Sequence, residues 1–547
     1  MARSLSYLLK AAALLLHRAA NVLAAAEGEM SFLADPPVWQ PEQIHLGLGA
    51  TIDIMTVHWV GARGEPSVKY GTRPDELSSQ QIGSSYVFTD SGPEKRNLTM
   101  HMVNMTDLQP DTDYYYQVGV ASGTWSTTFL FRSAPSIQGL NARGPMVYGV
   151  YGDLGDANGQ SMPSIKKAAY ARELDMILHV GDFAYDLHDD NGRNGDAFMR
   201  DIESIAAWVP YMVCPGNHES YYNFSHYTQR FRNMPSNSGT LTMPEFGTVP
   251  NNWWFSWDSG LVHFVSISTE LYFSQQQLVP RQYEWLTNDL ASVNRSRTPW
   301  VVVNGHRPLY CSCDGDCWSD ATRNRMGLEV DGKFRYGLEE VFNKYGVDMY
   351  IAAHEHNYER MFDVAPHWNP LLPMLSGATT KSTVDPPAPT YIVTGSAGNV
   401  EEHEPFVYPK LSRTAARFNT FGWSKMTVYN ASHLFWEQIQ TDDGGWDKVV
   451  DSTWIVQNSH GPFSAHPRRH VRAEPIETLE GSMEAADSYP NRAQQRPQEE
   501  KCWRKRRGEA LVCEDQARAT SMKKLGQWQA TKVLPGPGEG IDSSTFI

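Results

Sequence analysis

The 547-residue sequence predicts two folded domains, an all-β sandwich and then an α/β domain with mixed sheets and flanking helices, followed by a disordered C-terminal tail. Three observations predict this order. Apolar and polar residues alternate in residues 41–134, as in strands with one buried face. From Met146 onward, short apolar runs recur between helix-like stretches, which is typical of an α/β domain with a buried sheet. Beyond about Ser459 the periodicity ends, and the chain becomes polar and rich in Pro and Gly.

The β domain is predicted from the alternating runs at residues 55–60 and 113–120. The entry to the second run resembles the strand entry of fibronectin type III domains, where a tyrosine caps a corner of the sandwich. The residues that carry this resemblance are Leu108, Pro110, Thr112 and Tyr114. We therefore expect a fibronectin III-like domain at residues 38–138, with Trp59 in its core and no chemistry of its own.

Turn-forming residues at 133–145 predict a linker to the α/β domain, which we place at residues 145–457. Helix-like patterns occur at residues 164–174 and 334–344. The apolar runs that we interpret as its strands begin at Met146, Asp175, Val209, Leu261, Trp300, Asp348 and Thr390. Two strand-like segments, "WSKMTVYN" and "HLFWEQIQ", close the domain near Gln440.

The two ends of the chain differ from the domains between them. Residues 1–26 hold basic residues, then an apolar stretch, then small residues, and so predict a secretory signal peptide. Residues 460–547 predict a disordered tail. No later segment approaches the roughly 18 apolar residues that a membrane-spanning helix needs, so we expect no stable membrane insertion. Candidate N-glycosylation sites fit an exported protein and occur at Asn97, Asn104, Asn223, Asn294 and Asn430.

The cysteines leave two interpretations open. Cys311, Cys313 and Cys317 cluster in "CSCDGDC", which could be a zinc site or a local disulfide of undetermined pairing. A structural zinc site needs four ligands, and no second pair is near in sequence. Cys502 and Cys513 in the tail could pair, but nothing in the sequence decides this.

The acidic composition restricts the partners of the protein. The formal net charge is −15, which disfavours nucleic-acid binding driven by basic charge. An anionic substrate is still compatible with this charge, because a bound metal ion can dominate the local field.

Polar donor side chains follow five of the apolar runs. In chain order they are Asp153, then Asp182 with Tyr185, Asn217 with His218, His306, and His354 with His356. In α/β sheets, ligands bind in the crevice beyond the carboxyl ends of strands. Each residue alone has an ordinary explanation, such as a helix N-cap for an aspartate, but this gives no reason for donors to recur at strand ends. The pattern therefore predicts one site with metal ligands from several strands.

Several other polar residues have a structural interpretation. His179 and His263 lie inside apolar runs, and we interpret them as core or strand histidines. We expect a solvated loop at residues 188–190. Glu359 and Arg360 follow the last donors closely, and we expect a structural ion pair as their role.

The motifs Gly-Asp-Leu-Gly, Gly-Asp-Phe-Ala-Tyr, Gly-Asn-His-Glu, Gly-His-Arg-Pro and His-Glu-His, in this order, resemble those of purple acid phosphatases. The closest resemblance is to the long type, in which a fibronectin-like domain precedes an α/β metallophosphoesterase sandwich. It spans about residues 41–457 and implies two metals bridged by Asp182. The ligands implied for ferric iron are Asp153, Asp182, Tyr185 and His356. Those implied for a divalent iron, zinc or manganese ion are Asp182, Asn217, His306 and His354. His218 would face the substrate.

The resemblance implies an acid phosphatase that hydrolyses small phosphomonoesters with metal-activated hydroxide. A phenolate is an anionic oxygen ligand that suits hard ferric iron, so Tyr185 separates this family from calcineurin-like relatives that lack it. The sequence departs from the family pattern twice. Ala353 replaces a glycine before the first histidine of the His-x-His pair. Residues 307–333 also lack the histidine that plant members direct at the substrate, which leaves His218 to act alone.

Two alternatives remain open at this stage. The first is a phosphodiesterase or nucleotide pyrophosphatase on the same scaffold, which kinetics on diesters and monoesters would separate. The second is a non-catalytic glycoprotein binding module with a vestigial metal site. The export signals lead us to expect a secreted protein or one delivered to an acidic vacuole or lysosome lumen.

Overall fold

The structure is a computed structural model that describes residues 40–121, 123–364, 379–442 and 447–463, and the backbone of two short strands farther on. The signal peptide predicted at residues 1–26, and most of the tail predicted at 460–547, lie outside the described residues. The chain divides into two units, residues 1–473 and 474–547. In the second unit, β27 (Cys502–Trp503) pairs antiparallel with β28 (Val512–Cys513), with Cys502 opposite Cys513 in the ladder.

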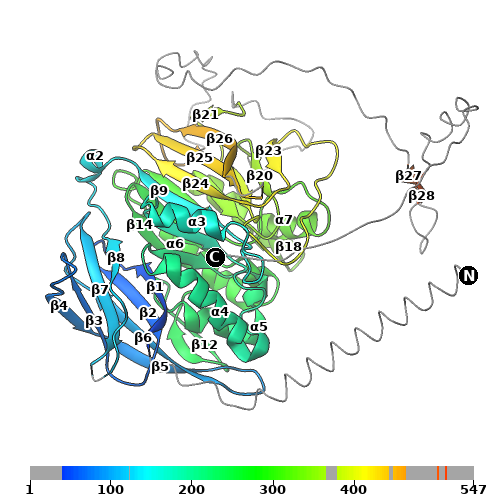
Figure 1. Cartoon of the computed structure of the whole chain (residues 1–547). Coiled ribbons are helices and arrows are strands. Elements are labelled where there is room, and N and C mark those ends of the chain that lie inside the picture. The colour runs from blue at the N-terminus through cyan, green and yellow to red at the C-terminus, as the bar shows by residue number, and fades with distance from the viewer. Residues whose placement is uncertain are drawn as a thin grey trace, which may run out of the picture. The chain divides into compact units, whose positions relative to one another are not determined.

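The first domain is a sandwich of two four-stranded antiparallel sheets (Figure 1, blue to cyan). One sheet has the order β1 (Glu42–Leu48), β2 (Met55–Val60), β6 (Asn97–Met105), β5 (Ser84–Thr89). The other has the order β4 (Ser79–Ile82), β3 (Pro66–Gly71), β7 (Asp113–Val120), β8 (Phe129–Arg132). Trp59 is fully buried, and the Gln109 N–H donates a 2.9 Å hydrogen bond to Oη of Tyr114. This bond is the tyrosine corner that the sequence predicts.

The α/β domain contains two seven-stranded mixed sheets. The first has the order β11 (Tyr211–Cys214), β10 (Met176–Val180), β9 (Met146–Tyr151), β24 (Gly422–Val428), β25 (His433–Gln440), β26 (Lys448–Val456), β21 (Ser382–Val384). The second has the order β14 (Phe255–Ser259), β15 (Val262–Ser266), β16 (Trp300–Asn304), β19 (Met349–Ala352), β22 (Thr390–Thr394), β20 (Tyr358–Met361), β23 (Thr414–Phe418). Figure 1 shows the C-terminal strands β24, β25 and β26 beside β9.

The two sheets pack against each other and carry helices. Tyr148 of β9 meets Phe264 of β15 edge to face, with ring centroids 5.1 Å apart. Helices in this domain are α3 (Met162–Tyr170), α4 (Asp189–Ala206), α5 (Tyr221–Arg230), α6 (Val279–Ser292), α7 (Cys317–Met326) and α8 (Leu338–Tyr345). Nε1 of Trp423 in β24 donates to Ser164 of α3 at 2.8 Å, which fixes that helix on the first sheet. Strands such as β10, β16 and β19 are buried at every residue, which explains their continuous apolar runs.

The smaller elements complete the domain. They are α2 (Leu140–Arg143), the hairpin of β12 (Thr240–Met243) with β13 (Gly247–Pro250), the hairpin of β17 (Gly327–Val330) with β18 (Lys333–Tyr336), and the 3-10 turns η2 (Asn217–Glu219), η3 (Thr269–Tyr272) and η4 (Gln276–Leu278).

The predicted fold class is confirmed, but three predicted boundaries are wrong. The helix predicted at residues 164–174 is α3, which ends at Tyr170. The domain closes with β26 and not near Gln440. The helix predicted at residues 334–344 begins only at Leu338, because the residues before it form strand β18. An Asp-Gly turn joins β17 to β18, with φ of 51° at Asp331 and 71° at Gly332. Positive φ at both central residues is what a two-residue hairpin turn of type I′ requires, and Asp-Gly is a sequence signal for it.

Candidate metal centre

The predicted donors follow the carboxyl ends of five strands, three in the first sheet and two in the second. Strands β9, β10 and β11 run parallel, as do β16 and β19, so their carboxyl ends form a common edge within each sheet. Four donors have left-handed backbone angles, which cost energy in residues with a side chain and cluster at functional sites. These φ angles are 57° at Asp153, 52° at Asp182, 48° at Tyr185 and 69° at His354.

Asp153, Tyr185 and His356 form the first group of donors. The Tyr185 hydroxyl donates to Oδ1 of Asp153 at 3.0 Å and lies 2.9 Å from Nε2 of His356. Nε2 of His356 is 3.5 Å from the same Asp153 oxygen. Nδ1 of His356 lies 3.2 Å from the carbonyl oxygen of Glu402, so a proton on Nδ1 leaves the Nε2 lone pair facing the other two donors.

Asp182, Asn217 and His306 begin the second group. Nε2 of His306 lies 3.1 Å from Oδ2 of Asp182 and 3.0 Å from Oδ1 of Asn217. Nδ1 of His306 lies 2.9 Å from the carbonyl oxygen of Val180, which again directs Nε2 into the group. His354 joins this group, because its ring and the ligand atoms of Asp182 and His306 all lie within 4.8 Å of one another.

The two groups share the turn that carries His354. The His354 N–H donates to Oδ2 of Asp153 at 3.0 Å, while the His354 ring belongs to the second group. The structure thus brings together all seven residues that the sequence predicts as metal ligands. Ala353, the first departure from the family pattern, is fully buried and packs against Gly152. A Cβ atom added to Gly152 would lie only 2.4 Å from the Ala353 methyl group. The methyl is accommodated because its neighbour is glycine.

His218 lies beside the donors with its ring oriented by a carboxylate. Nδ1 of His218 is 2.6 Å from Oδ1 of Asp186, and Nε2 is 3.9 Å from Oδ2 of Asp182. Burial alone would lower the pKa of His218, but the charge of Asp182 and the hydrogen bond to Asp186 raise it to about 10. Cations held by Asp182 would oppose this shift, whereas the contact with Asp186 is independent of them.

Glu219 supports two of the ligand loops, and the sequence reasoning did not assign it a role. Its buried carboxyl group accepts three backbone N–H bonds, from Asp182 at 2.9 Å, Phe183 at 3.0 Å and Gly216 at 2.8 Å. Gly216 also approaches Asp182 so closely that an added Cβ would lie 2.2 Å from Oδ1. The motif Gly-Asn-His-Glu could have pointed to this role, because its last residue is a glutamate three positions from the glycine.

Arg307 is a second residue that the sequence reasoning left without a role. Its Nε donates to both carboxylate oxygens of Glu270 at 3.0 Å, and Nη1 donates to Nε2 of His354 at 2.8 Å and to Asp320. A buried guanidinium therefore stands beside the second donor group, in the segment that lacks a histidine.

The residues set aside from the site have mixed outcomes. The expected structural ion pair forms at Arg360, with Asp451 as its partner, but not at Glu359. The two side chains do not pair with each other, because neighbours on a strand point to opposite faces of the sheet. Glu359 instead accepts a 2.5 Å bond from Thr414, and Arg360 makes a two-point contact with Asp451 at 2.7 and 2.9 Å.

The histidines set aside from the site are structural. Nδ1 of His179 lies 2.6 Å from the Tyr211 hydroxyl in the core. His263 bridges Asp258 and Asp289 at 2.8 and 3.0 Å. At residues 188–190 both aspartates are exposed, as expected, but they belong to the start of helix α4 and not to a loop. The ring of His188 stacks on Tyr221, with ring centroids 3.8 Å apart.

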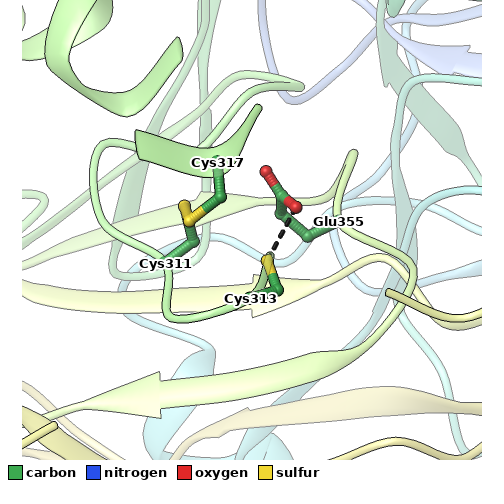
Figure 2. A group of neighbouring side chains, drawn as sticks. All are labelled: Cys311, Cys313, Cys317 and Glu355. Carbon is green, nitrogen blue, oxygen red and sulfur yellow. Dashed lines mark hydrogen bonds between the residues drawn. A yellow bond between two sulfur atoms is a disulfide. The ribbon is translucent and has the colours of Figure 1, made fainter. Parts of the chain in front are cut away.

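The cysteine cluster contains a disulfide. Cys311 and Cys317 are bonded, and Cys313 is a free, buried thiol that contacts Glu355 (Figure 2). The disulfide alternative therefore describes the structure.

The donor set fits a dinuclear centre of two unlike metals. The first group offers a phenol and a carboxylate, which are oxygen ligands for a hard trivalent cation. Burial and the charge of Asp153 raise the pKa of Tyr185 well above its usual 10, so a strong cation is needed to ionise it. The second group offers imidazole, amide and carboxylate ligands that suit a divalent transition metal.

Comparison with known proteins gives matches along most of the chain. Residues 41–133 match the profile "Purple acid Phosphatase, N-terminal domain", residues 146–358 match "Calcineurin-like phosphoesterase", and residues 388–452 match "Iron/zinc purple acid phosphatase-like protein C". The chain is 40% identical to acid phosphatase type 7 of Danio rerio, over 78% of this chain and 94% of the relative. It is 39% identical to acid phosphatase type 7 of Homo sapiens, over 78% and 93% of the two chains.

A solved structure of a purple acid phosphatase from yellow lupin (Lupinus luteus) seeds has the same fold. The TM-score is 0.60 at 24% sequence identity, and the match covers 76% of this chain and 74% of the lupin chain. At this identity the likeness is one of fold alone.

Proposed function

Since the chain belongs to the purple acid phosphatase family, we propose that its dinuclear centre holds ferric iron beside a divalent metal ion, and that His218 supplies a proton to the leaving group. The chain is a phosphoric monoester hydrolase that works with a dinuclear metal centre. Its substrates are small phosphorylated molecules. The identity of the metals and the role of each ligand are the parts that we propose.

The residues that would hold ferric iron are Asp153, Asp182, Tyr185 and His356. The proposed ligands of the divalent iron, zinc or manganese ion are Asp182, Asn217, His306 and His354. The observation that carries the proposal is the meeting of the Tyr185 hydroxyl with Asp153 and His356 at 3.0 and 2.9 Å. When bound, the two cations supply Lewis acidity toward a phosphate oxygen and a nucleophile from water at acid pH.

His218 supplies a proton at Nε2 in this proposal. Asp186 accepts the Nδ1 proton at 2.6 Å, which fixes the ring and stabilises its protonated form. The Nε2–H then faces the donors, 3.9 Å from Asp182, where the leaving oxygen of a phosphomonoester would need a proton. A proton held there lowers the barrier to departure of an alkoxide.

Metal analysis of the purified chain tests the proposal most directly. We expect about one iron and one divalent metal per chain, and faster hydrolysis of nitrophenyl phosphate than of its bis-ester. A strong preference for the diester would instead favour a phosphodiesterase. A chain with no bound metal and no turnover would favour a binding module with a vestigial site.

His218→Asn separates the proton donor from the metals. It should reduce hydrolysis of esters with poor leaving groups by about 10²–10⁴-fold, because general acid catalysis contributes on this scale. Esters with good leaving groups should lose much less, and the metal content should not change. An equal loss for both ester classes would contradict the role of His218.

We also propose export, to the outside of the cell or to an acidic vacuole or lysosome lumen. The proposal is supported by the leader-like pattern at residues 1–26 and by exposed sequon asparagines at Asn97, Asn104, Asn294 and Asn430. Asn223 is half-buried and its amide donates to Glu245 at 2.8 Å, so glycan attachment would break a contact there. None of the helices in the described part of the chain combines the length and hydropathy of a membrane span. Glycosidase treatment and N-terminal sequencing of the native protein test this proposal.

A further inference from the structure

The cysteine cluster is a buried group of four possible metal ligands. Cys311, Cys313 and Cys317 lie on one short segment, and Glu355 reaches them from the turn after β19 (Figure 2). Each of the four side chains is at most 2% exposed. The Cys313 thiol donates to Oε2 of Glu355, with sulfur and oxygen 2.7 Å apart. These are the residue types that bind zinc in proteins.

Glu355 is the fourth ligand that the sequence near the cysteines lacks. It lies 42 residues from Cys313 and is 1% exposed. Its second oxygen, Oε1, is buried and has no hydrogen-bond partner among the described residues. A buried carboxylate oxygen without a partner is costly, and a cation in the cluster would satisfy it.

The spacing of the four ligands fits a tetrahedral ion. One ligand atom from each side chain lies within 4.8 Å of the other three. Zinc–sulfur bonds of about 2.3 Å place sulfur atoms about 3.8 Å apart around a tetrahedron. Cys311 and Cys317 cannot serve as thiolate ligands while they are bonded to each other, so the disulfide and the ion exclude each other.

Two arginines offset the negative charge that such a site would carry. Nη2 of Arg413 donates to the carbonyl oxygen of Cys311 at 2.7 Å, and Nη1 of Arg417 donates to Oγ of Ser312 at 3.3 Å. Three thiolates and a carboxylate exceed the charge of one divalent ion, and cations beside the loop reduce the cost of burying that excess.

We propose that Cys311, Cys313, Cys317 and Glu355 bind a zinc ion when the Cys311–Cys317 disulfide is reduced. A dithiol reduces the disulfide by two electrons and is itself oxidised to a disulfide, which leaves two new thiols. Zinc then displaces the protons of the three thiols, which pass to solvent, and forms three Zn–S bonds and one Zn–O bond. The loop thus alternates between a disulfide and a metal site.

This site shares no ligand with the dinuclear centre, although Glu355 lies between His354 and His356. The proposed ligands of the dinuclear centre include no sulfur, so a signal from metal–thiolate bonds reports on the cysteine site alone. Cobalt(II) is a suitable probe, because it replaces zinc and its thiolate bonds give a charge-transfer band in the near ultraviolet.

The test uses the full chain with Cys502→Ser and Cys513→Ser, which removes the tail thiols. The chain is reduced with a dithiol, freed of it without air, and titrated with cobalt(II). We expect the cobalt–thiolate band only after reduction of the disulfide. Zinc added in an amount equal to the cobalt should abolish this band. Cys313→Ser should lower the band by about one third, and both Cys313→Ser and Glu355→Gln should weaken cobalt binding tenfold or more.

The matched control is Cys214→Ser, which alters the other free cysteine of the described residues and should keep the full band. Circular dichroism checks whether each variant is folded. If one of the variants Cys313→Ser and Glu355→Gln does not fold, the cobalt affinity of the other variant tests the proposal. The proposal is overturned if the reduced chain shows no thiolate band, or if both variants bind cobalt as well as the parent. A disulfide that contains Cys313 in the untreated chain, found by peptide mapping, would also overturn it.

Discussion

Replacing Glu219 should lower the free energy of unfolding of the α/β domain, by an amount that grows with the number of hydrogen bonds lost. Its carboxyl group accepts one N–H at Oε1, from Phe183, and two at Oε2, from Asp182 and Gly216. Burial and the charge of Asp182 raise the pKa of Glu219 to about 8, so we use the energies of uncharged hydrogen bonds. A buried N–H left without an acceptor costs about 1–3 kcal/mol.

Glu219→Ala leaves all three N–H groups without an acceptor, so the free energy of unfolding should fall by about 3–9 kcal/mol. Glu219→Gln keeps the oxygen that accepts two bonds and loses the bond to Phe183, so the fall should be about 1–3 kcal/mol. Scanning calorimetry of the metal-free chain measures the difference. At about 2 °C per kcal/mol for a large domain, the alanine variant should melt at least about 6 °C below the parent.

The control is Glu245→Ala, which removes a half-buried glutamate that accepts one hydrogen bond, from Asn223. Its melting temperature should change by about 2 °C or less. The reasoning is refuted if Glu219→Ala melts within 2 °C of the parent, or if the glutamine variant melts as low as the alanine variant.

Three further predictions concern colour, pH and metal. Tyr185→Phe should remove the visible phenolate-to-iron absorption and weaken iron retention tenfold or more, and an unchanged spectrum would show that Tyr185 is not a ligand. Burial lowers the pKa of His263, but hydrogen bonds to Asp258 and Asp289 raise it to about 9. The protonated ring therefore adds about 3 kcal/mol to the free energy of unfolding. This stabilisation is complete below pH 6.5 and is lost as the pH rises through 9. Urea unfolding of His263→Gln should show no such loss between pH 6 and 10, and a parallel decline in parent and variant would contradict this. Chelation should abolish hydrolysis and lower the melting temperature. For metal at 1,000 times its Kd, the free energy of unfolding should fall by about 4 kcal/mol. A chelated chain that melts at the same temperature as the metal-loaded chain would exclude a stabilising centre.

The strands and the order of the donors could be predicted from the sequence because both are local properties. Strands such as β10 and β16 are buried on both faces, so they appear as continuous apolar runs. Donors such as Asp153 and His306 follow the strand ends directly, and parallel strands bring their carboxyl ends to one edge. The error at residues 334–336 has the opposite cause, since a short hairpin joined to a helix has no periodicity of its own.

Contacts between distant residues were decided only by the tertiary structure. The sequence by itself determined the two domains, the donor residues and the resemblance that they carry. It did not determine that Arg360 binds Asp451, 91 residues away, or that Glu355 meets Cys313, 42 residues away. The physical reason is that each of these contacts depends on the packing of segments that no local pattern connects. A side chain's neighbours across the fold are set by how the sheets and loops come together, whereas its place on a strand is set by the residues beside it.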